Sequence, residues 1–265
     1  MIRRSFLAGA VALAGAVTLP VLPATAKTSP KPFPLPSELQ AGDLLWPKVP
    51  GAIVPYYRNG PANLAADYGE WTAERKARMA ALRLRPDAYS QAQLGALEAM
   101  SYYQFRARYL EGYEPGRLTP YSFGGIAAVG HVAIVTMDKN GVPGIIEAYS
   151  PKGVVPSTYA DWITAHPGEI CWQGRLKGIT SADGDKFAAA ALKYKRRPYD
   201  FWNFDLSDAN GFYCSKLVWL ALMQSLNIAI DGNTNPKRLF WLSPKQELYA
   251  KTVDILLDQG NYTNA

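Results

Sequence analysis

The sequence is poor in the residues that bind metals or cross-link small domains. Among its 265 residues there are only two cysteines and two histidines. Two cysteines exclude a disulfide framework, and neither pair alone supplies the ligand set of a zinc finger. Charged residues make up 19% of the chain, and its main basic cluster is the short segment Lys193–Arg197, which is typical of a helix C-terminus. This charge pattern argues against a nucleic-acid partner.

The chain is rich in the residues that a folded core needs. Hydrophobic residues make up 48% of it and aromatic residues 12%, which excludes a disordered protein. The 20 prolines and 22 glycines exclude a long helical rod or coiled coil. We therefore expect a globular α+β or α/β protein with one sizeable core.

The first 26 residues predict an export signal. Arg3 and Arg4 precede an uncharged run rich in Ala, Gly, Val and Leu, which ends at Ala24-Thr25-Ala26. Paired arginines followed by an apolar run and a small-x-small site are typical of a twin-arginine signal peptide. The alternative is a membrane anchor, which the two prolines in the run disfavour. Cleavage after Ala26 lowers the formal net charge from +6 to +4.

The rest of the chain indicates a linker and one domain. Residues 27–40 contain four prolines, which predict an extended spacer that adds nothing to the core. The domain then spans 41–265. Within it, helix-forming residues predict one helix over 72–84 and a second over 90–112. These helices make up a helical insertion at about 56–123.

Strand and helix patterns in the second half predict the centre of the fold. Two apolar runs, 131–137 and 145–149, flank Asn140-Gly141 and predict a β-hairpin. A third apolar run, 169–173, predicts another strand. Residues 213–223 are apolar on nearly every side, so this helix should be central and buried.

Three residues could form a catalytic site. Cys214 begins the buried helix, where the helix dipole favours a thiolate. A nucleophile needs a base, and His131 opens an apolar strand, whereas His166 precedes a proline in a loop. Glu147, in the second strand of the hairpin, could orient the imidazole, because a carboxylate in so apolar a strand should be exposed at an edge or paired.

The hairpin register decides whether His131 and Glu147 can meet. If the loop is 139–141 with Gly141 left-handed, Asp138 pairs with Val142. His131 then faces Tyr149, and Glu147 is its diagonal neighbour on the same face. A two-residue Asn-Gly turn would put Glu147 on the opposite face. The proposed chemistry therefore predicts the longer loop.

Each of these residues also has a structural interpretation. Cys214 could be a buried small hydrophobe, or it could form a disulfide with Cys171 in an oxidising compartment. His131 could be a surface histidine and Glu147 a solvated edge residue. Tyrosines 199 and 213 could be ordinary core aromatics.

Five short motifs together resemble the permuted NlpC-type papain-like amidases of the YaeF/YiiX-like group. In chain order they are Gly42-Asp-Leu-Leu-Trp, Gly130-His-Val-Ala-Ile-Val, Ile146-Glu-Ala-Tyr-Ser-Pro, Pro198-Tyr-Asp-Phe and Phe212-Tyr-Cys-Ser-Lys-Leu-Val. In unpermuted NlpC-type cell-wall peptidases, the cysteine segment precedes the histidine strand. The resemblance covers roughly 40–225. Lys216 departs from it, since the family usually has glycine or glutamate there.

The resemblance implies a circularly permuted papain-like α+β fold, with an antiparallel sheet packed on the Cys-bearing helix. It implies that Cys214 is the nucleophile, His131 the base and Glu147 the orienting residue. We expect the oxyanion to be bound by the Cys214 backbone N–H. The expected substrate-binding residues are Tyr149, Tyr199 and Tyr213.

The sequence therefore predicts an exported cysteine hydrolase that cleaves an amide bond in a cell-wall peptide or an N-acyl, lipid-like amide. This chemistry requires no cofactor and no metal. The predicted export places the protein near the cell wall or a membrane surface. The alternatives are a lipid acyltransferase that uses the same thioester and a ligand-binding module without catalysis.

Overall fold

The computed structural model describes residues 31–50, 52–56, 63–110 and 129–260. The predicted signal peptide, 1–26, lies outside these residues. So do the first part of the spacer and parts of the predicted insertion. No helix within the described ranges has the length and hydrophobicity needed to cross a membrane.

A six-stranded sheet forms the centre of the fold, and its neighbouring strands are antiparallel. Its order is β4-β3-β2-β1-β5-β6. The strands are β1 (Leu44–Lys48), β2 (Ala133–Met137), β3 (Pro143–Tyr149), β4 (Gly153–Thr158), β5 (Ile170–Leu176) and β6 (Val253–Leu257).

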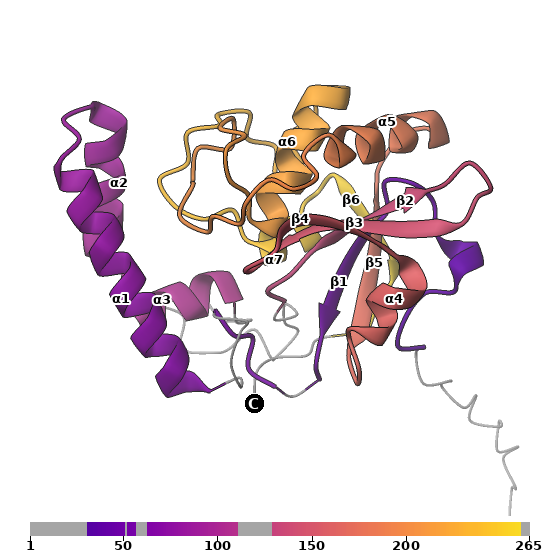
Figure 1. The fold of residues 1–265 in the computed structure, drawn as a ribbon, viewed down its shortest axis with the longest axis horizontal. Helices are drawn as coiled ribbons and strands as arrows, with labels where there is room; N and C mark the ends of the chain where they lie inside the picture. Colours follow the sequence, from indigo (N-terminus) through magenta and orange to yellow (C-terminus); the bar gives the residue numbers. More distant parts are fainter. Residues whose placement is uncertain (1–30, 51, 57–62, 111–128, 261–265) are drawn as a thin grey trace, which may run out of the picture.

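Helices cover both faces of this sheet (Figure 1). One face packs against α5 (Ser181–Leu192) and α6 (Cys214–Leu226). The other face packs against α4 (Tyr159–Thr164). A short helix, α7 (Pro244–Leu248), contacts α6 and β6. The α+β class and the antiparallel sheet packed on the Cys-bearing helix agree with the prediction.

Helix α6 is the buried central helix that the sequence predicts. Every residue from Cys214 to Leu222 is buried, because the helix lies between the sheet, α5 and α7. Each large apolar side chain buried in this way contributes roughly 1.5–3 kcal/mol to folding. The helix therefore gives its first residue, Cys214, a rigid support.

The hairpin of β2 and β3 has the predicted register. Met137 pairs with Pro143 and Ile134 with Ile146, and the Asp138 N–H donates to the Val142 carbonyl at 3.0 Å. Gly141 has a φ of +77°, which glycine adopts without steric cost. Extending the same pairing places residue 131 opposite 149, with 147 diagonal to it on the same face.

The described part of the predicted insertion is helical, but its helix boundaries differ from the prediction. Helix α1 (Leu64–Arg83) starts eight residues earlier than predicted, because the Asn63 side chain caps it. The predicted helix over 90–112 is divided, since Ser101 and Gln104 form a capping box that starts a new helix. The three resulting elements are α2 (Ala88–Ala99), α3 (Tyr102–Phe105) and the π-helical turn η2 (Arg106–Leu110).

The described part of the spacer belongs to the core, contrary to the prediction. Leu39 is buried with Tyr159 and Trp162 on the α4 face of the sheet. The Pro32 carbonyl accepts from the N–H of Cys171 at 2.7 Å, and the Pro34 carbonyl accepts from the Tyr159 hydroxyl at 2.8 Å. A proline residue keeps its backbone carbonyl as an acceptor, so this proline-rich segment can still hydrogen-bond to β5 and α4.

The Gly42-Asp43 motif has a structural role. Gly42 has a φ of +84°, and a Cβ there would lie 2.8 Å from the Cα of Gly184, so β1 can approach α5 only with glycine at this position. The fully buried Asp43 carboxylate accepts two hydrogen bonds from Arg175, at 2.6 and 2.9 Å, and one from Gln173 at 2.8 Å. This motif joins β1 to β5 and α5.

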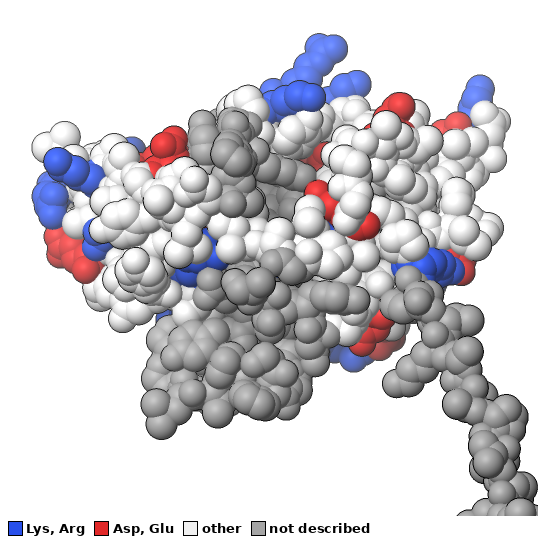
Figure 2. Space-filling view, turned by 90° about the horizontal axis from the view of Figure 1, so that it is seen from below, with Lys and Arg blue, Asp and Glu red and all other residues white. Residues whose placement is uncertain are grey.

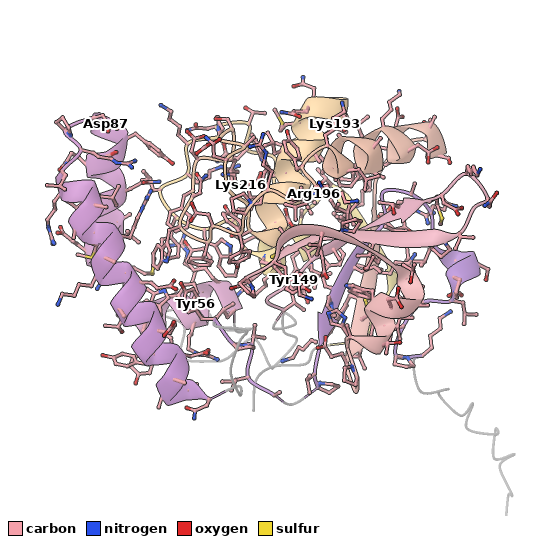
Figure 3. All side chains as sticks on the ribbon, viewed as in Figure 1. Tyr56, Asp87, Tyr149, Lys193, Arg196 and Lys216 are labelled. Carbon is pink, nitrogen blue, oxygen red and sulfur yellow. The ribbon has the colours of Figure 1, made fainter. Side chains whose placement is uncertain are left out.

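Charged side chains of both signs are interspersed over the described part of the face shown in Figure 2. The basic cluster begins at Lys193, which is the C-cap of α5, as the sequence predicts. In the view of Figure 3, Lys193 lies at the top of the molecule, and Tyr56 and Tyr149 lie in its lower half.

Candidate active site

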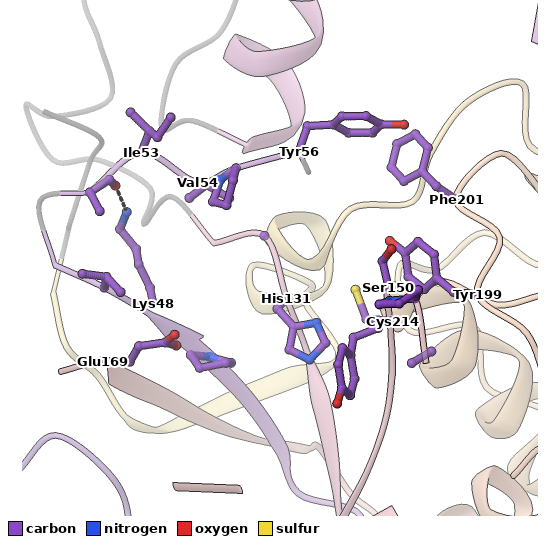
Figure 4. A pocket seen from close by; sticks show the side chains of 18 of the residues that line it. Lys48, Ile53, Val54, Tyr56, His131, Ser150, Glu169, Tyr199, Phe201 and Cys214 are labelled. Atoms are coloured by element: carbon purple, nitrogen blue, oxygen red, sulfur yellow. Dashed lines mark hydrogen bonds between the residues drawn. The ribbon is translucent and has the colours of Figure 1, made fainter. Parts of the chain in front are cut away.

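A pocket of about 520 Å³ lies at the end of strands β1, β2 and β3 and is also lined by the first residue of α6. Its lining includes Cys214 and His131, which the sequence places 83 residues apart. Figure 4 shows both side chains in this pocket. The fold therefore brings the predicted nucleophile and base to one cavity.

His131 and Glu147 form a close pair. The Nε2 atom of His131 lies 2.5 Å from Oε2 of Glu147, so the two side chains are in direct hydrogen-bond contact. Glu147 is only 6% exposed, and the register of β2 and β3 puts both side chains on one face. Because an ionised carboxylate can only accept, Nε2 carries the proton in this contact. The other ring nitrogen, Nδ1, then has the lone pair that a general base needs.

Trp162 is a site residue that the sequence analysis missed. Its indole Nε1–H donates to the same Glu147 oxygen at 3.2 Å. Trp162 comes from α4, and Phe33 contacts it edge-on while Tyr159 stacks on it. It follows β4, a strand that the sequence analysis did not predict, and no motif marks it.

Cys214 occupies the first position of α6, and the preceding residue, Tyr213, is the N-cap. Tyr213 makes no side-chain capping bond. The first backbone N–H groups of a helix have no acceptor within it, and the dipole adds positive potential there. This position favours a thiolate and an oxyanion.

The three predicted substrate-binding tyrosines separate into two groups. Tyr149 and Tyr199 line the pocket. Tyr213 is fully buried and is not among the lining residues, and burial raises the pKa of its hydroxyl well above the usual value. Tyr213 therefore packs in the core at the start of α6, and this position does not support its predicted contact with substrate.

The structure contradicts a Cys171–Cys214 disulfide. Both residues are thiols. Cys171 belongs to the apolar cluster on the α4 face of the sheet, and Cys214 to the larger cluster on the α6 face. His166 is also outside the pocket lining; its Nδ1–H donates to the Trp162 carbonyl at 2.7 Å.

Lys216 is buried but does not line the pocket. Its Nζ donates to the Asn203 carbonyl at 3.3 Å and lies 5.7 Å from the Phe212 ring centroid. Burial lowers its pKa to about 8, while Asp208 and other nearby acids act in the opposite direction. The cation that departs from the family pattern is therefore directed toward the 200–208 loop.

Further pocket residues come from segments where the sequence showed no chemical motif. Lys48 and Glu169 line one part of the pocket. Burial and the nearby Arg106 lower the pKa of Lys48 to about 8. Tyr56 and Glu74, from the insertion, line another part. Figure 4 shows Lys48 and Tyr56 on different sides of the His131 ring.

Several solved chains match this sequence, and one of them is a bacterial protein of similar extent. It is described as metalloprotein yiiX from Escherichia coli O157:H7 (DUF1105), and the match covers 82% of this chain and 96% of that one, at 17% sequence identity and a TM-score of 0.45. Among the residues that our structure describes, no group of three or more His, Cys, Asp or Glu side chains is placed to hold a metal ion. No curated protein matches.

A family model matches residues 117–256, which hold His131, Glu147 and Cys214. The model describes permuted papain-like amidase enzymes, YaeF/YiiX, of family C92. The chain order of the motifs, with histidine before cysteine, and the antiparallel sheet fit this description. Because the match spans more than half of the chain, the protein belongs to the C92 family of permuted papain-like amidases.

Proposed function

We propose that the protein is an exported cysteine amidase in which Cys214 is the nucleophile, His131 the general base and Glu147 the residue that orients the imidazole. The observation that carries this proposal is the 2.5 Å contact between His131 Nε2 and Glu147 Oε2, beside a pocket that Cys214 also lines. Membership of an amidase family supports hydrolysis of an amide as the reaction class.

The mechanism follows from the protonation of the imidazole. With Nε2–H donated to Glu147, Nδ1 takes the proton of the Cys214 thiol. The thiolate sulfur then attacks the amide carbonyl carbon, and the N-terminus of α6 stabilises the oxyanion. Protonated His131 gives its proton to the leaving amine as the C–N bond breaks, which leaves a thioester on Cys214. His131 then deprotonates water, which attacks the thioester and releases the acid.

The substrate is an amide of a cell-wall peptide or of an acyl group. The N-terminal pattern in 1–26 supports export to the cell envelope, where both kinds of amide occur. Neither a nucleic acid nor an organic cofactor enters this mechanism.

Alkylation with iodoacetamide tests the nucleophile. We expect Cys214 to be alkylated at pH 6 much faster than an ordinary thiol of pKa about 8.5. His131→Ala should slow this reaction toward the rate of a free thiol. Equal alkylation rates in the wild type and in His131→Ala would contradict the pairing of thiol and imidazole.

Product analysis separates the reaction classes. An amidase releases acid and amine in water, and Cys214→Ala abolishes that release. Transfer of the acyl group to an added alcohol or amine in preference to water would instead identify an acyltransferase. A binding module would show neither product.

A further inference from the structure

Three aromatic side chains form one wall of the pocket, which we call the aromatic wall: Tyr56, Phe201 and Trp202. The ring centroids of Tyr56 and Phe201 are 4.9 Å apart at 85°, and those of Phe201 and Trp202 are 5.1 Å apart at 84°. Such edge-to-face pairs are a favourable arrangement of aromatic rings. Figure 4 shows the Tyr56 and Phe201 rings beside each other in the pocket that Cys214 also lines.

A single carboxylate holds the polar ends of this wall. Oε2 of Glu74 accepts a hydrogen bond from the Tyr56 hydroxyl and another, at 2.8 Å, from the indole Nε1–H of Trp202. Glu74 itself comes from α1 in the helical insertion. Because these two donors are used by Glu74, the wall presents mainly ring surface to the pocket.

The insertion also fixes the backbone behind the wall. Oδ2 of Asp67 accepts from the backbone N–H of Tyr56 at 2.8 Å and from Nη1 of Arg106 at 3.3 Å. The side chains of Asp67 and Arg106 are each only 2% exposed. The Phe105 ring packs against both Tyr56 and Phe201. The wall is therefore built in advance of any ligand.

The neighbouring lining extends the apolar surface. Ile53, Val54 and Pro55 precede Tyr56 and line the same pocket. A cavity of about 520 Å³ is within the range of roughly 300–1,000 Å³ that is usual for small-molecule sites. It therefore has room for a group of several carbon atoms beside the reacting amide.

We infer that the aromatic wall is a specificity subsite for an apolar group of the amide substrate, a hydrocarbon chain or an aromatic ring, and that Glu74 is the positioning residue that maintains it. The inference rests on the proposed function for its link to catalysis at Cys214. It favours amides with an apolar substituent over substrates whose groups beside the scissile bond are charged, since a carboxylate substituent would approach Glu74.

Calorimetric binding to the full chain carrying Cys214→Ala tests this subsite without any reaction. The probes are N-octylacetamide and N-propylacetamide, which share one amide and differ by five methylene groups. Since each buried methylene favours binding by about fourfold at best, we expect the octyl compound to bind at least tenfold more tightly, at one site per chain.

Variants of the wall should remove this preference. Glu74→Ala and, independently, Phe201→Ala should each weaken octyl binding at least fivefold. Glu74→Gln should retain most of it, because its carbonyl still accepts both hydrogen bonds. Glu70→Ala, one turn earlier on α1 and outside the pocket lining, is the matched control and should bind like the parent.

Equal affinity for the two probes would overturn the inference, and so would parental octyl binding in both Glu74→Ala and Phe201→Ala. These outcomes do not depend on the reactivity of Cys214. Failure of the proposed function would instead be seen as slow alkylation of the wild-type thiol, with the binding preference intact.

Discussion

Trp162 and His131 both donate to the same oxygen of Glu147. The imidazole contact is 2.5 Å and the indole contact 3.2 Å, and Glu147 is buried. Hydrogen bonds donated to a carboxylate favour its ionised form, whereas burial alone would favour the neutral acid. The indole therefore helps Glu147 to stay charged and to hold the imidazole in the orientation that the mechanism requires.

Trp162→Phe tests this relationship. The substitution keeps an aromatic ring between Phe33 and Tyr159 but removes the N–H donor. We expect kcat/KM to fall about tenfold, and the acidic limb of its pH profile to move to higher pH, because Glu147 becomes easier to protonate. The measurement is kcat/KM from pH 4 to 9 on an amide substrate that the wild type hydrolyses.

Trp219→Phe is the control for Trp162→Phe. Its indole donates to the Asn233 carbonyl at 3.3 Å, and it is not among the residues that line the pocket. We expect each of the two substitutions to lower the free energy of unfolding by about 1 kcal/mol, because each removes one hydrogen bond. Only Trp219→Phe should keep the wild-type pH profile. If the acidic limb of the pH profile does not move in Trp162→Phe, Trp162 does not support the ionised form of Glu147.

The two cysteines should differ sharply in reactivity. Burial raises the pKa of the Cys171 thiol well above its usual value, and its sulfur lies near the Trp172 carbonyl, at 3.2 Å. We expect native protein to take up one iodoacetamide group per chain, at Cys214, and denatured protein two. Intact-mass measurement followed by peptide mapping checks both numbers. Native labelling at Cys171 would show that the α4 face of the sheet opens to solvent.

The buried ion pair behind the pocket should be important for stability. Removing one partner of a buried pair leaves the other charge uncompensated and costs about 3–5 kcal/mol. Asp67→Ala should therefore lower the free energy of unfolding by that amount, measured by urea unfolding. It should also increase hydrogen exchange in 52–56, since Asp67 accepts from the Tyr56 N–H.

Glu98→Ala provides the contrast for Asp67→Ala. Glu98 pairs with Arg83 at 2.9 Å, but both side chains are about half exposed, and such pairs contribute at most about 1 kcal/mol. Equal losses in the two variants would show that the Asp67–Arg106 pair is not a structural anchor of the insertion.

The sequence was sufficient to predict the hairpin because its turn and strand signals are local. Its register was chosen from the proposed chemistry, since an Asn-Gly turn of two residues was also possible and only the longer loop puts Glu147 on the same face as His131. The cysteine was identifiable from the apolar helix that follows it. Its position in the same pocket required the resemblance to a family, because no local rule joins residues 131 and 214.

The rest of the site depends on contacts that are distant in sequence. Glu74 accepts hydrogen bonds from both Tyr56 and Trp202, and Trp202 is 128 residues from Glu74 along the chain. No sequence pattern near Glu74 indicates these partners. Strands β4 and β6 were not predicted because proline, serine and charged residues interrupt their apolar pattern. The prolines led to the prediction that the spacer makes no core contacts, although Leu39 is buried and two proline carbonyls accept hydrogen bonds from β5 and α4.

Lys216 should make the protein more stable as the pH rises above 8. Its folded pKa is about 8, whereas an unfolded lysine titrates near 10.4. Below pH 8 both states are protonated, and the folded state bears the full cost of the buried charge. Between about pH 8 and 10.4 the unfolded state binds more protons, so this group adds to stability as the pH rises.

Lys216→Met tests the sign of this effect. The methionine removes the buried charge, and a pKa shift of this size corresponds to a free-energy cost of up to about 3 kcal/mol for that charge. The substitution also leaves Asp200, Asp205 and Asp208 without the cation that attracts them. We therefore expect equal or greater stability than the wild type at pH 7, and a smaller rise in the free energy of unfolding from pH 8 to 10.

Guanidinium unfolding at pH 7, 8, 9 and 10 measures both. Lys76→Met, at an exposed position on α1, should keep the wild-type slope. A Lys216→Met variant that is several kcal/mol less stable at pH 7, with the wild-type slope retained, would mean that the ammonium is stabilised in the fold and that its pKa is not lowered.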